Sequence, residues 1–196
     1  YWIGSFLFVI GCKLIFRGLE NFAKNKNYIL IANHTSIFDP VITTQFFPHP
    51  TKSIAKKTFA KVPIFGYIYS WGSILVDRND KNNRMKSYLE MKEVLANGID
   101  MVIYPEGTRN KNRDEITLLP FRNGAFKLSI ETQKEIIPIV ILNAHKVINP
   151  KDGISIKPGK IYIDILNPIS PKDFTEEELK NYCYNIMKNH LENYQA

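Results

Sequence analysis

The sequence predicts a single α/β domain, in which a mixed and mostly parallel sheet is flanked by helices. Two observations predict this fold. Short apolar runs rich in β-branched residues recur along the chain, and segments with helical spacing lie between several of them. The size agrees with it, because 196 residues, of which 44% are hydrophobic, can bury the core of one domain without disulfides or metals.

The expected elements follow in order along the chain. Pro40 is a helix-start signal, and Gly98 ends a segment with helical spacing. Residues 175–178 form a capping box that opens a last helix, and Pro158 with Gly159 predicts a hairpin between the last two strands. Strands are expected near 28–32, 53–55, 73–76, 101–104, 136–142, 154–157 and 160–166, and helices over 79–97, 123–132 and 175–193.

The first twelve residues are apolar and aromatic, and Lys13 and Arg17 follow them. The run is shorter than the roughly 20 apolar residues that a membrane span needs, and it lacks the features of a signal peptide. Three interpretations of this apolar run remain: a buried first helix, a helix in the membrane interface, or the tail of a membrane-spanning segment. The aromatic residues and the cations favour the membrane. We therefore expect a helical, membrane-associating segment over 1–20 and an α/β domain over 21–196.

The net charge indicates which binding partners to expect, and the cysteine content bears on metal sites and disulfides. The net charge of +7 implies attraction to an anionic partner, such as a phosphorylated substrate, an acidic membrane surface or nucleic acid. No recognised nucleic-acid-binding module accompanies this charge, so we expect no nucleic-acid partner. Cys12 and Cys183 are the two cysteines, and their wide separation indicates neither a metal site nor a disulfide.

A polar turn with a histidine and a carboxylate follows the first predicted strand. His34 and Asp39 are five residues apart, which on a continuous helix places them about 140° apart, so they can pair only where the chain turns. A strand-to-helix junction supplies such a turn. Asp39 would then accept a hydrogen bond from one ring nitrogen and leave the other free to take a proton. The alternative is that Asp39 caps a helix and that His34 is a polar loop residue.

A second polar turn, over 106–109, follows the strand expected at 101–104. Its glycine permits a tight backbone, and Arg109 offers a planar charged group suited to phosphate. The alternative is a surface turn with a solvated pair between Glu106 and Arg109.

The two turns are expected at one edge of the sheet, since ligands of open α/β sheets bind outside the carboxyl ends of the strands. Lys56 and Arg78 also follow predicted strands, and with Arg109 they could converge on one anionic group. The apolar and aromatic stretch over 62–72 is either core or the lining of an acyl-chain groove.

Taken together, these residues resemble the motifs of the lysophosphatidic acid acyltransferases, a family of glycerolipid acyltransferases. The motifs occur in the family's order over residues 28–142, and 120–125 resembles the stretch after the third motif. The matching positions are Asn-His-x4-Asp at Asn33, His34 and Asp39; the second motif at Lys56 or Lys57, Pro63, Gly66, Gly72, Asp77 and Arg78; Glu-Gly-Thr-Arg at 106–109; and an apolar run around a proline at 136–140.

The resemblance implies a reaction for the acyltransferase domain over 21–196. A fatty acyl group would pass from acyl-CoA or acyl-carrier protein to the free hydroxyl of 1-acylglycerol 3-phosphate, giving phosphatidic acid in phospholipid biosynthesis. His34 would be the general base and Asp39 would orient it. Attack on the thioester would be direct, without an acyl-enzyme. Substrate binding would fall to Lys56, Arg78, Glu106, Gly107, Thr108 and Arg109.

The same resemblance sets the expected partners and location. The partners are the lysophospholipid and acyl thioester substrates and a membrane surface, with acyl-carrier protein as a candidate. Beyond the donor substrate we expect no cofactor and no metal, and we expect membrane association at the cytoplasmic face. Two alternatives are the same chemistry on glycerol 3-phosphate or another lysolipid, and a non-catalytic membrane-binding domain.

Overall fold

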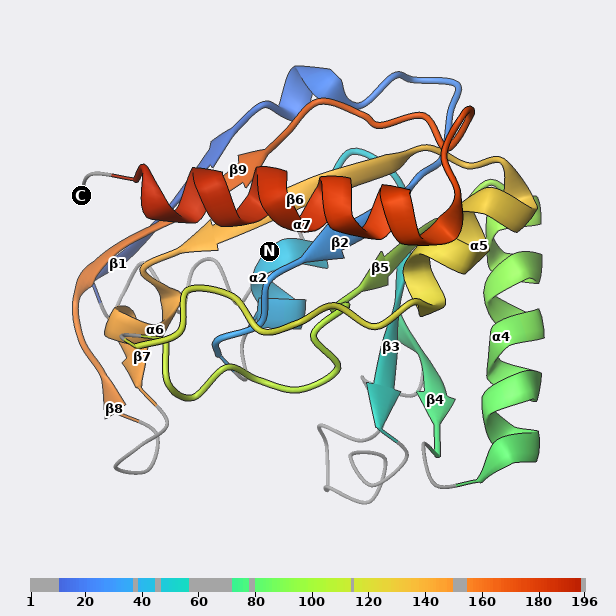
Figure 1. Cartoon of the computed structure of the whole chain (residues 1–196). Helices are drawn as coiled ribbons and strands as arrows, with labels where there is room; N and C mark the ends of the chain where they lie inside the picture. Colours follow the sequence, from blue (N-terminus) through green and yellow to red (C-terminus); the bar gives the residue numbers. More distant parts are fainter. Residues whose placement is uncertain are drawn as a thin grey trace.

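The computed structural model describes residues 11–36, 39–44, 47–56, 72–77, 80–113, 115–149 and 155–194. Within them a seven-stranded sheet has the order β1-β9-β6-β2-β5-β3-β4 (Figure 1). Its strands are β1 (Cys12–Arg17), β2 (Ile29–Ala32), β3 (Thr51–Lys56), β4 (Ser73–Val76), β5 (Asp100–Ile103), β6 (Ile136–Leu142) and β9 (Gly159–Ile165). Two short strands, β7 (Ile148–Asn149) and β8 (Ser155–Ile156), pair with each other beside it.

The five strands β2 to β6 run parallel, as the sequence predicts. β2 lies between β5 and β6, and β3 lies between β5 and β4. β9 is antiparallel to β6, and β1 is parallel to β9, so these two strands run the opposite way. The carboxyl ends of β2 to β6 therefore share one edge of the sheet, where a parallel fold places its ligands.

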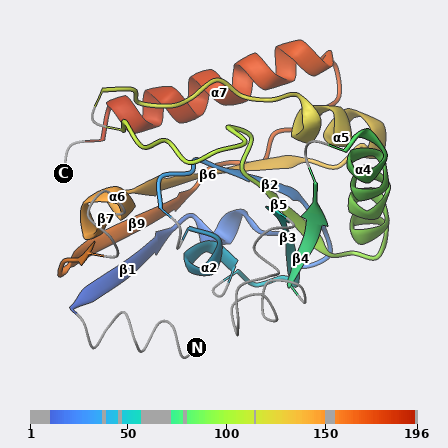
Figure 2. The ribbon, with the colours of Figure 1, turned by 90° about the horizontal axis from the view of Figure 1, so that it is seen from below.

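Helices cover both faces of the sheet (Figure 2). One face carries α4 (Lys81–Ala96), α5 (Gly124–Thr132) and α7 (Glu176–Glu192), and the opposite face carries α2 (Asp39–Thr44). The short η1 (Leu19–Asn21) and α6 (Ala144–Val147) join strands. Two apolar cores result, because alternate strand residues point to opposite faces: Ile29 and Ile31 pack on the α7 side, Leu30 and Ala32 on the α2 side.

The last helix begins as the sequence predicts. The Thr175 side chain accepts a hydrogen bond from the Glu178 amide, and the Glu178 side chain accepts one from the Thr175 amide. This capping box satisfies two amides that a helix start otherwise leaves unpaired. Leu179, Cys183 and Met187 then bury one face of α7 against the sheet.

The prediction of a helix over 1–20 is wrong for Cys12–Arg17, which form β1; residues 1–10 lie outside the described part of the chain. The apolar residues of this stretch alternate as a strand requires. Leu14 and Phe16 pack on the α2-side core, while Lys13 and Arg17 are exposed. Among the described residues, none of the helices is both long and apolar enough to cross a bilayer.

The expected hairpin around Pro158 is also wrong. β8 pairs with β7, whereas β9 pairs with β1 and β6. The Lys157 amide donates to the Val147 carbonyl oxygen at 2.8 Å, and Gly159 already belongs to β9. The two runs therefore enter different sheets, and Ile161 and Ile163 of β9 are buried where that strand lies between β1 and β6.

A buried carboxylate at the far end of β9 ties three elements together. Asp164 accepts two hydrogen bonds from Arg17 of β1, at 2.5 and 2.6 Å, and one from His190 of α7, at 2.7 Å. The Arg17 guanidinium also lies 5.0 Å from the centre of the Tyr162 ring. Although burial opposes ionisation, the hydrogen bonds from His190 and Arg17 hold the pKa of Asp164 below its usual value.

We expect Asp164→Ala to lower the free energy of unfolding by about 1–3 kcal/mol at pH 7, because it removes hydrogen bonds between charged groups. Urea denaturation followed by circular dichroism measures the change. Glu135→Ala is the control, since it breaks the exposed ion pair with Lys26 and should cost less than about 1 kcal/mol.

The pH dependence gives a second readout of the same variant. A carboxyl whose pKa is lowered by folding stabilises the protein above its unfolded pKa, near 3.8, and this contribution disappears as the pH falls through the folded pKa. The wild type and Asp164→Ala should therefore converge in acid. A constant difference down to pH 2 would contradict an ionic role for Asp164.

Candidate active site

The site begins where β2 leaves the sheet, at Asn33. This side chain is buried, and its amide group bonds to Ile141 of β6 in both directions: Asn33 Nδ2 donates to the Ile141 oxygen at 3.0 Å, and Asn33 Oδ1 accepts from the Ile141 amide at 2.7 Å. The asparagine thus continues the hydrogen bonding between β2 and β6 by one residue. It fixes the point at which the chain turns towards His34.

His34 and Asp39 are brought together by that turn. His34 Nδ1 lies 2.8 Å from Asp39 Oδ2, as the sequence predicts, which leaves Nε2 as the second ring nitrogen. Asp39 is fully buried, and its Oδ2 also accepts from the amides of Thr35 and Ser36, both at 2.7 Å. Asp39 therefore holds the preceding loop and the imidazole. Among the described residues its oxygens cap no amide of α2, which rules out the helix-cap interpretation.

An aromatic residue that the sequence analysis did not assign holds the other side of the imidazole. The Tyr104 and His34 rings have centroids 4.5 Å apart. The Tyr104 hydroxyl lies 3.0 Å from Thr43 Oγ1, and the Thr43 hydroxyl donates to the Asp39 carbonyl oxygen at 2.8 Å. The ring of His34 is thereby confined between β5 and α2. The available signal was the position of Tyr104 directly after a buried strand.

Glu106 joins the second turn to the first. Its Oε1 accepts from the His34 amide at 2.6 Å, and its Oε2 accepts from the Leu119 amide at 3.0 Å. Only 4% of the residue is exposed, so a solvated surface pair with Arg109 is ruled out. Burial raises the pKa of Glu106 to about 7, although the two amide hydrogen bonds act against this shift.

The remainder of the second turn folds back onto His34. The Asn110 amide donates to the His34 carbonyl oxygen at 2.7 Å, so both backbone groups of His34 are bound by this turn. Gly107 has a φ of +72°, a conformation that favours glycine. Thr108 is exposed and Arg109 is partly buried. Four predicted site residues, 106–109, therefore lie beside His34.

The structure describes the other predicted cations, Lys56 and Arg78, only in part or not at all. Lys56 ends β3, at the same edge of the sheet as the two turns, and the structure does not describe its side chain. Arg78 and the stretch 57–71 lie outside the described residues. In the described part of the chain, no group of three or more histidine, cysteine, aspartate or glutamate side chains is arranged to hold a metal ion.

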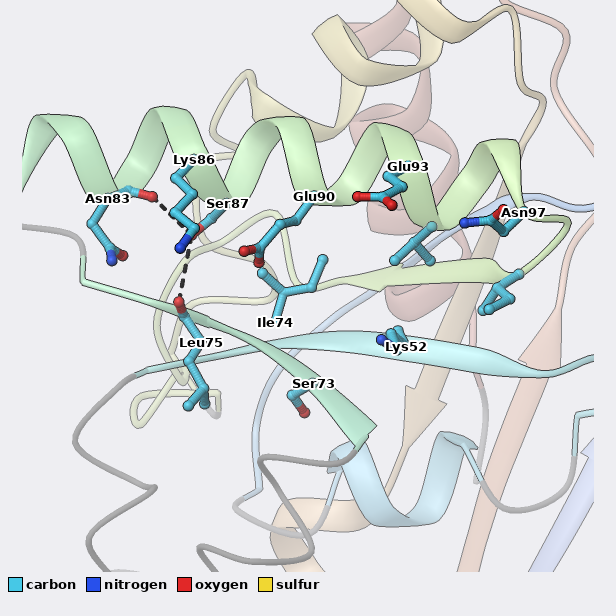
Figure 3. A pocket seen from close by; sticks show the side chains of 12 residues that line it. Lys52, Ser73, Ile74, Leu75, Asn83, Lys86, Ser87, Glu90, Glu93 and Asn97 are labelled. Atoms are coloured by element: carbon cyan, nitrogen blue, oxygen red, sulfur yellow. Dashed lines mark hydrogen bonds between the residues drawn. The ribbon is translucent and has the colours of Figure 1, made fainter.

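A separate pocket of about 450 Å³ lies between α4 and the strands β3 and β4 (Figure 3). Ser87 on its wall donates hydrogen bonds to the carbonyl oxygens of Asn83, at 2.8 Å, and Leu75, at 3.4 Å. Its lining includes both Lys52 and Glu90, so it presents charge of both signs. None of the predicted site residues lines it.

Comparisons with known proteins show the family of this chain. The profile of the acyltransferase family matches residues 13–142. Curated 1-acyl-sn-glycerol-3-phosphate acyltransferases from Saccharomyces cerevisiae and Haemophilus influenzae are 31% and 30% identical to the chain, over 91% and 97% of its length. The relative from Escherichia coli is 33% identical over 83% of this chain and 66% of its own. The chain spans 58% of the yeast protein and 79% of the Haemophilus protein.

A solved structure has the same fold. The crystal structure of the 1-acyl-sn-glycerophosphate (LPA) acyltransferase PlsC from Thermotoga maritima aligns with a TM-score of 0.81 and 27% identity, over 96% of this chain and 75% of that one. The family profile covers the β2 turn and the Glu106 turn, which the structure places side by side. The chain therefore belongs to the acyltransferase family.

Proposed function

We propose that this chain transfers a fatty acyl group from an acyl thioester to the free hydroxyl of 1-acylglycerol 3-phosphate, giving phosphatidic acid. The observation that carries the proposal is the 2.8 Å contact between His34 Nδ1 and Asp39 Oδ2, beside a turn that carries Arg109. It unites a base for a hydroxyl with a cation for a phosphate. The names of the relatives support the same acceptor.

The proton path follows from the ring geometry. His34 Nε2 takes the proton of the acceptor hydroxyl as its oxygen attacks the thioester carbonyl carbon. Asp39 keeps Nδ1 protonated and stabilises the imidazolium that forms. When the tetrahedral intermediate collapses, the C–S bond breaks and the thiol leaves with the proton that His34 carried. The new ester, the free thiol and neutral His34 are the products, and no protein nucleophile takes part.

The anionic end of the acceptor is assigned to the cations of the same edge. Arg109 binds the phosphate, with Lys56 and Arg78 as further ligands and Thr108 as a hydroxyl donor at the same turn. Glu106 and Gly107 shape the acceptor pocket by holding the turn against His34, since both Glu106 oxygens are already bound to backbone amides.

The donor and the location complete the proposal. Acyl-CoA and acyl-carrier protein both present the thioester that the mechanism needs. The net charge of +7 and the apolar opening residues favour binding of the enzyme to an anionic membrane surface. We assign this binding to the cytoplasmic face of the membrane.

We expect His34→Ala to lower kcat by about 10²–10⁴-fold, the usual contribution of general base catalysis. Thiol release with lysophosphatidic acid and either acyl-CoA or acyl-carrier protein as donor measures it, and circular dichroism verifies the fold. His190→Gln is the matched control, because His190 also bonds to an aspartate but lies on α7, at the far end of β9. Near-normal turnover by His34→Ala would refute the mechanism. No thiol release by the wild type with any lysolipid would refute the proposed function.

We expect Glu106→Gln to change how stability depends on pH. Between about pH 4.5 and 7 the folded protein binds a proton at Glu106 that the unfolded chain has lost, so the wild type loses stability relative to the variant as the pH rises. The slope is at most about 1.4 kcal/mol per pH unit, and it vanishes above pH 7. Urea denaturation at several pH values measures it. Parallel curves for the two proteins would show that Glu106 titrates normally.

A further inference from the structure

Gly107 leaves a notch in the second turn, and the side chain of Arg122 lies in it. A Cβ atom placed on Gly107 would be 2.5 Å from Arg122 Nε, 2.8 Å from Cδ and 3.0 Å from Cζ. These distances are shorter than van der Waals contact, so any larger residue would displace the guanidinium. Glycine therefore suits position 107 in two ways: its positive φ favours glycine, and the absence of a Cβ leaves room for the Arg122 side chain.

The backbone on either side of Arg122 is held firmly. The Arg122 amide donates to the Pro105 carbonyl oxygen at 2.8 Å, directly before Glu106. The preceding residue, Phe121, is buried, and its ring centroid lies 5.1 Å from that of Tyr184. Arg122 is thus attached both to the core under α7 and to the turn that binds His34.

The guanidinium itself has no charged partner in the part of the chain that the structure describes. Arg122 is exposed and forms no ion pair or side-chain hydrogen bond there. By contrast, Lys127, five residues along on α5, pairs with Glu131 at 3.7 Å. A cation that is positioned by its surroundings and left unpaired is available to an anionic ligand.

We propose that Arg122 binds a phosphate group of a substrate, together with Arg109. The inference rests on the proposed function and adds a ligand to it. In 1-acylglycerol 3-phosphate the reacting hydroxyl and the phosphate are on adjacent carbons, so the phosphate must lie close to His34. The turn that carries Gly107, against which the Arg122 side chain lies, is bonded to both backbone groups of His34. A planar guanidinium at that place binds phosphate through two parallel hydrogen bonds.

The acceptor arm of the test compares two substrates with the same acyl chain. Arg122→Gln should raise KM for lysophosphatidic acid by about 10- to 100-fold and leave kcat/KM for monoacylglycerol, which has no phosphate, unchanged. Arg122→Lys should be intermediate, because it keeps the charge and loses the planar group. Lys127→Gln removes an equal charge from α5 and should behave as the wild type.

The donor arm distinguishes the two sources of phosphate. Acyl-CoA carries phosphates and an acyl thioester of N-acetylcysteamine carries none. A rise in KM for acyl-CoA alone would assign Arg122 to the donor phosphates, and a rise for lysophosphatidic acid alone would assign it to the acceptor. An Arg122→Gln enzyme with unchanged KM for both phosphorylated substrates would overturn the proposal and leave the proposed function intact.

A binding measurement tests Arg122 apart from turnover. Glycerol 3-phosphate added to the wild type should give a broadened ³¹P resonance, and the broadening should be lost in Arg122→Gln and kept in Lys127→Gln. Equal broadening in all three proteins would overturn the role of Arg122 whether or not the wild type acylates lysophosphatidic acid.

Discussion

The buried carboxylate of Glu106 is the contact on which the site depends. It links the loop after β2 to the turn after β5 through the His34 amide, and it reaches Leu119 with its other oxygen. Burying a carboxylate among apolar residues is unfavourable, and hydrogen bonds from backbone amides offset that cost. Together with the hydrogen bond from the Asn110 amide to the His34 carbonyl oxygen, this link joins two loops at the ends of neighbouring strands. With it, the proposed base and the proposed phosphate ligands keep one geometry.

The structure contains two further histidine–aspartate pairs, and their surroundings differ from those of His34. Asp100, at the start of β5, bonds to His49 and to the Tyr28 amide, and Asp164 of β9 bonds to Arg17 and His190. These two pairs join structural elements. His34 instead bonds to Asp39 through Nδ1 and packs against the Tyr104 ring, and its Nε2 is the nitrogen assigned to the proposed proton transfer.

Much of the framework could be predicted from the sequence, because local patterns determine it. The five parallel strands, the helix over 81–96 and the capping box of α7 follow from periodicity and from side chains near in sequence. The contact between His34 and Asp39 was predicted from the need for a turn between them. The partners of β1 and β8 and the placement of Arg122 on Gly107 were not predicted. Each of these depends on contacts between distant residues, which no local pattern encodes.

The pairing of β1 has a consequence for how the chain folds. Cys12 lies opposite Gly159 in the register of β1 and β9, and the Arg17–Asp164 hydrogen bonds span 147 positions in the sequence. Such non-local pairing slows folding, because the loop entropy is lost before the contacts form. During synthesis β1 emerges first among the described strands and has no neighbour until β9 has been made. The first strand in the sequence is therefore among the last to find its place, and until then its open edge can pair with other chains.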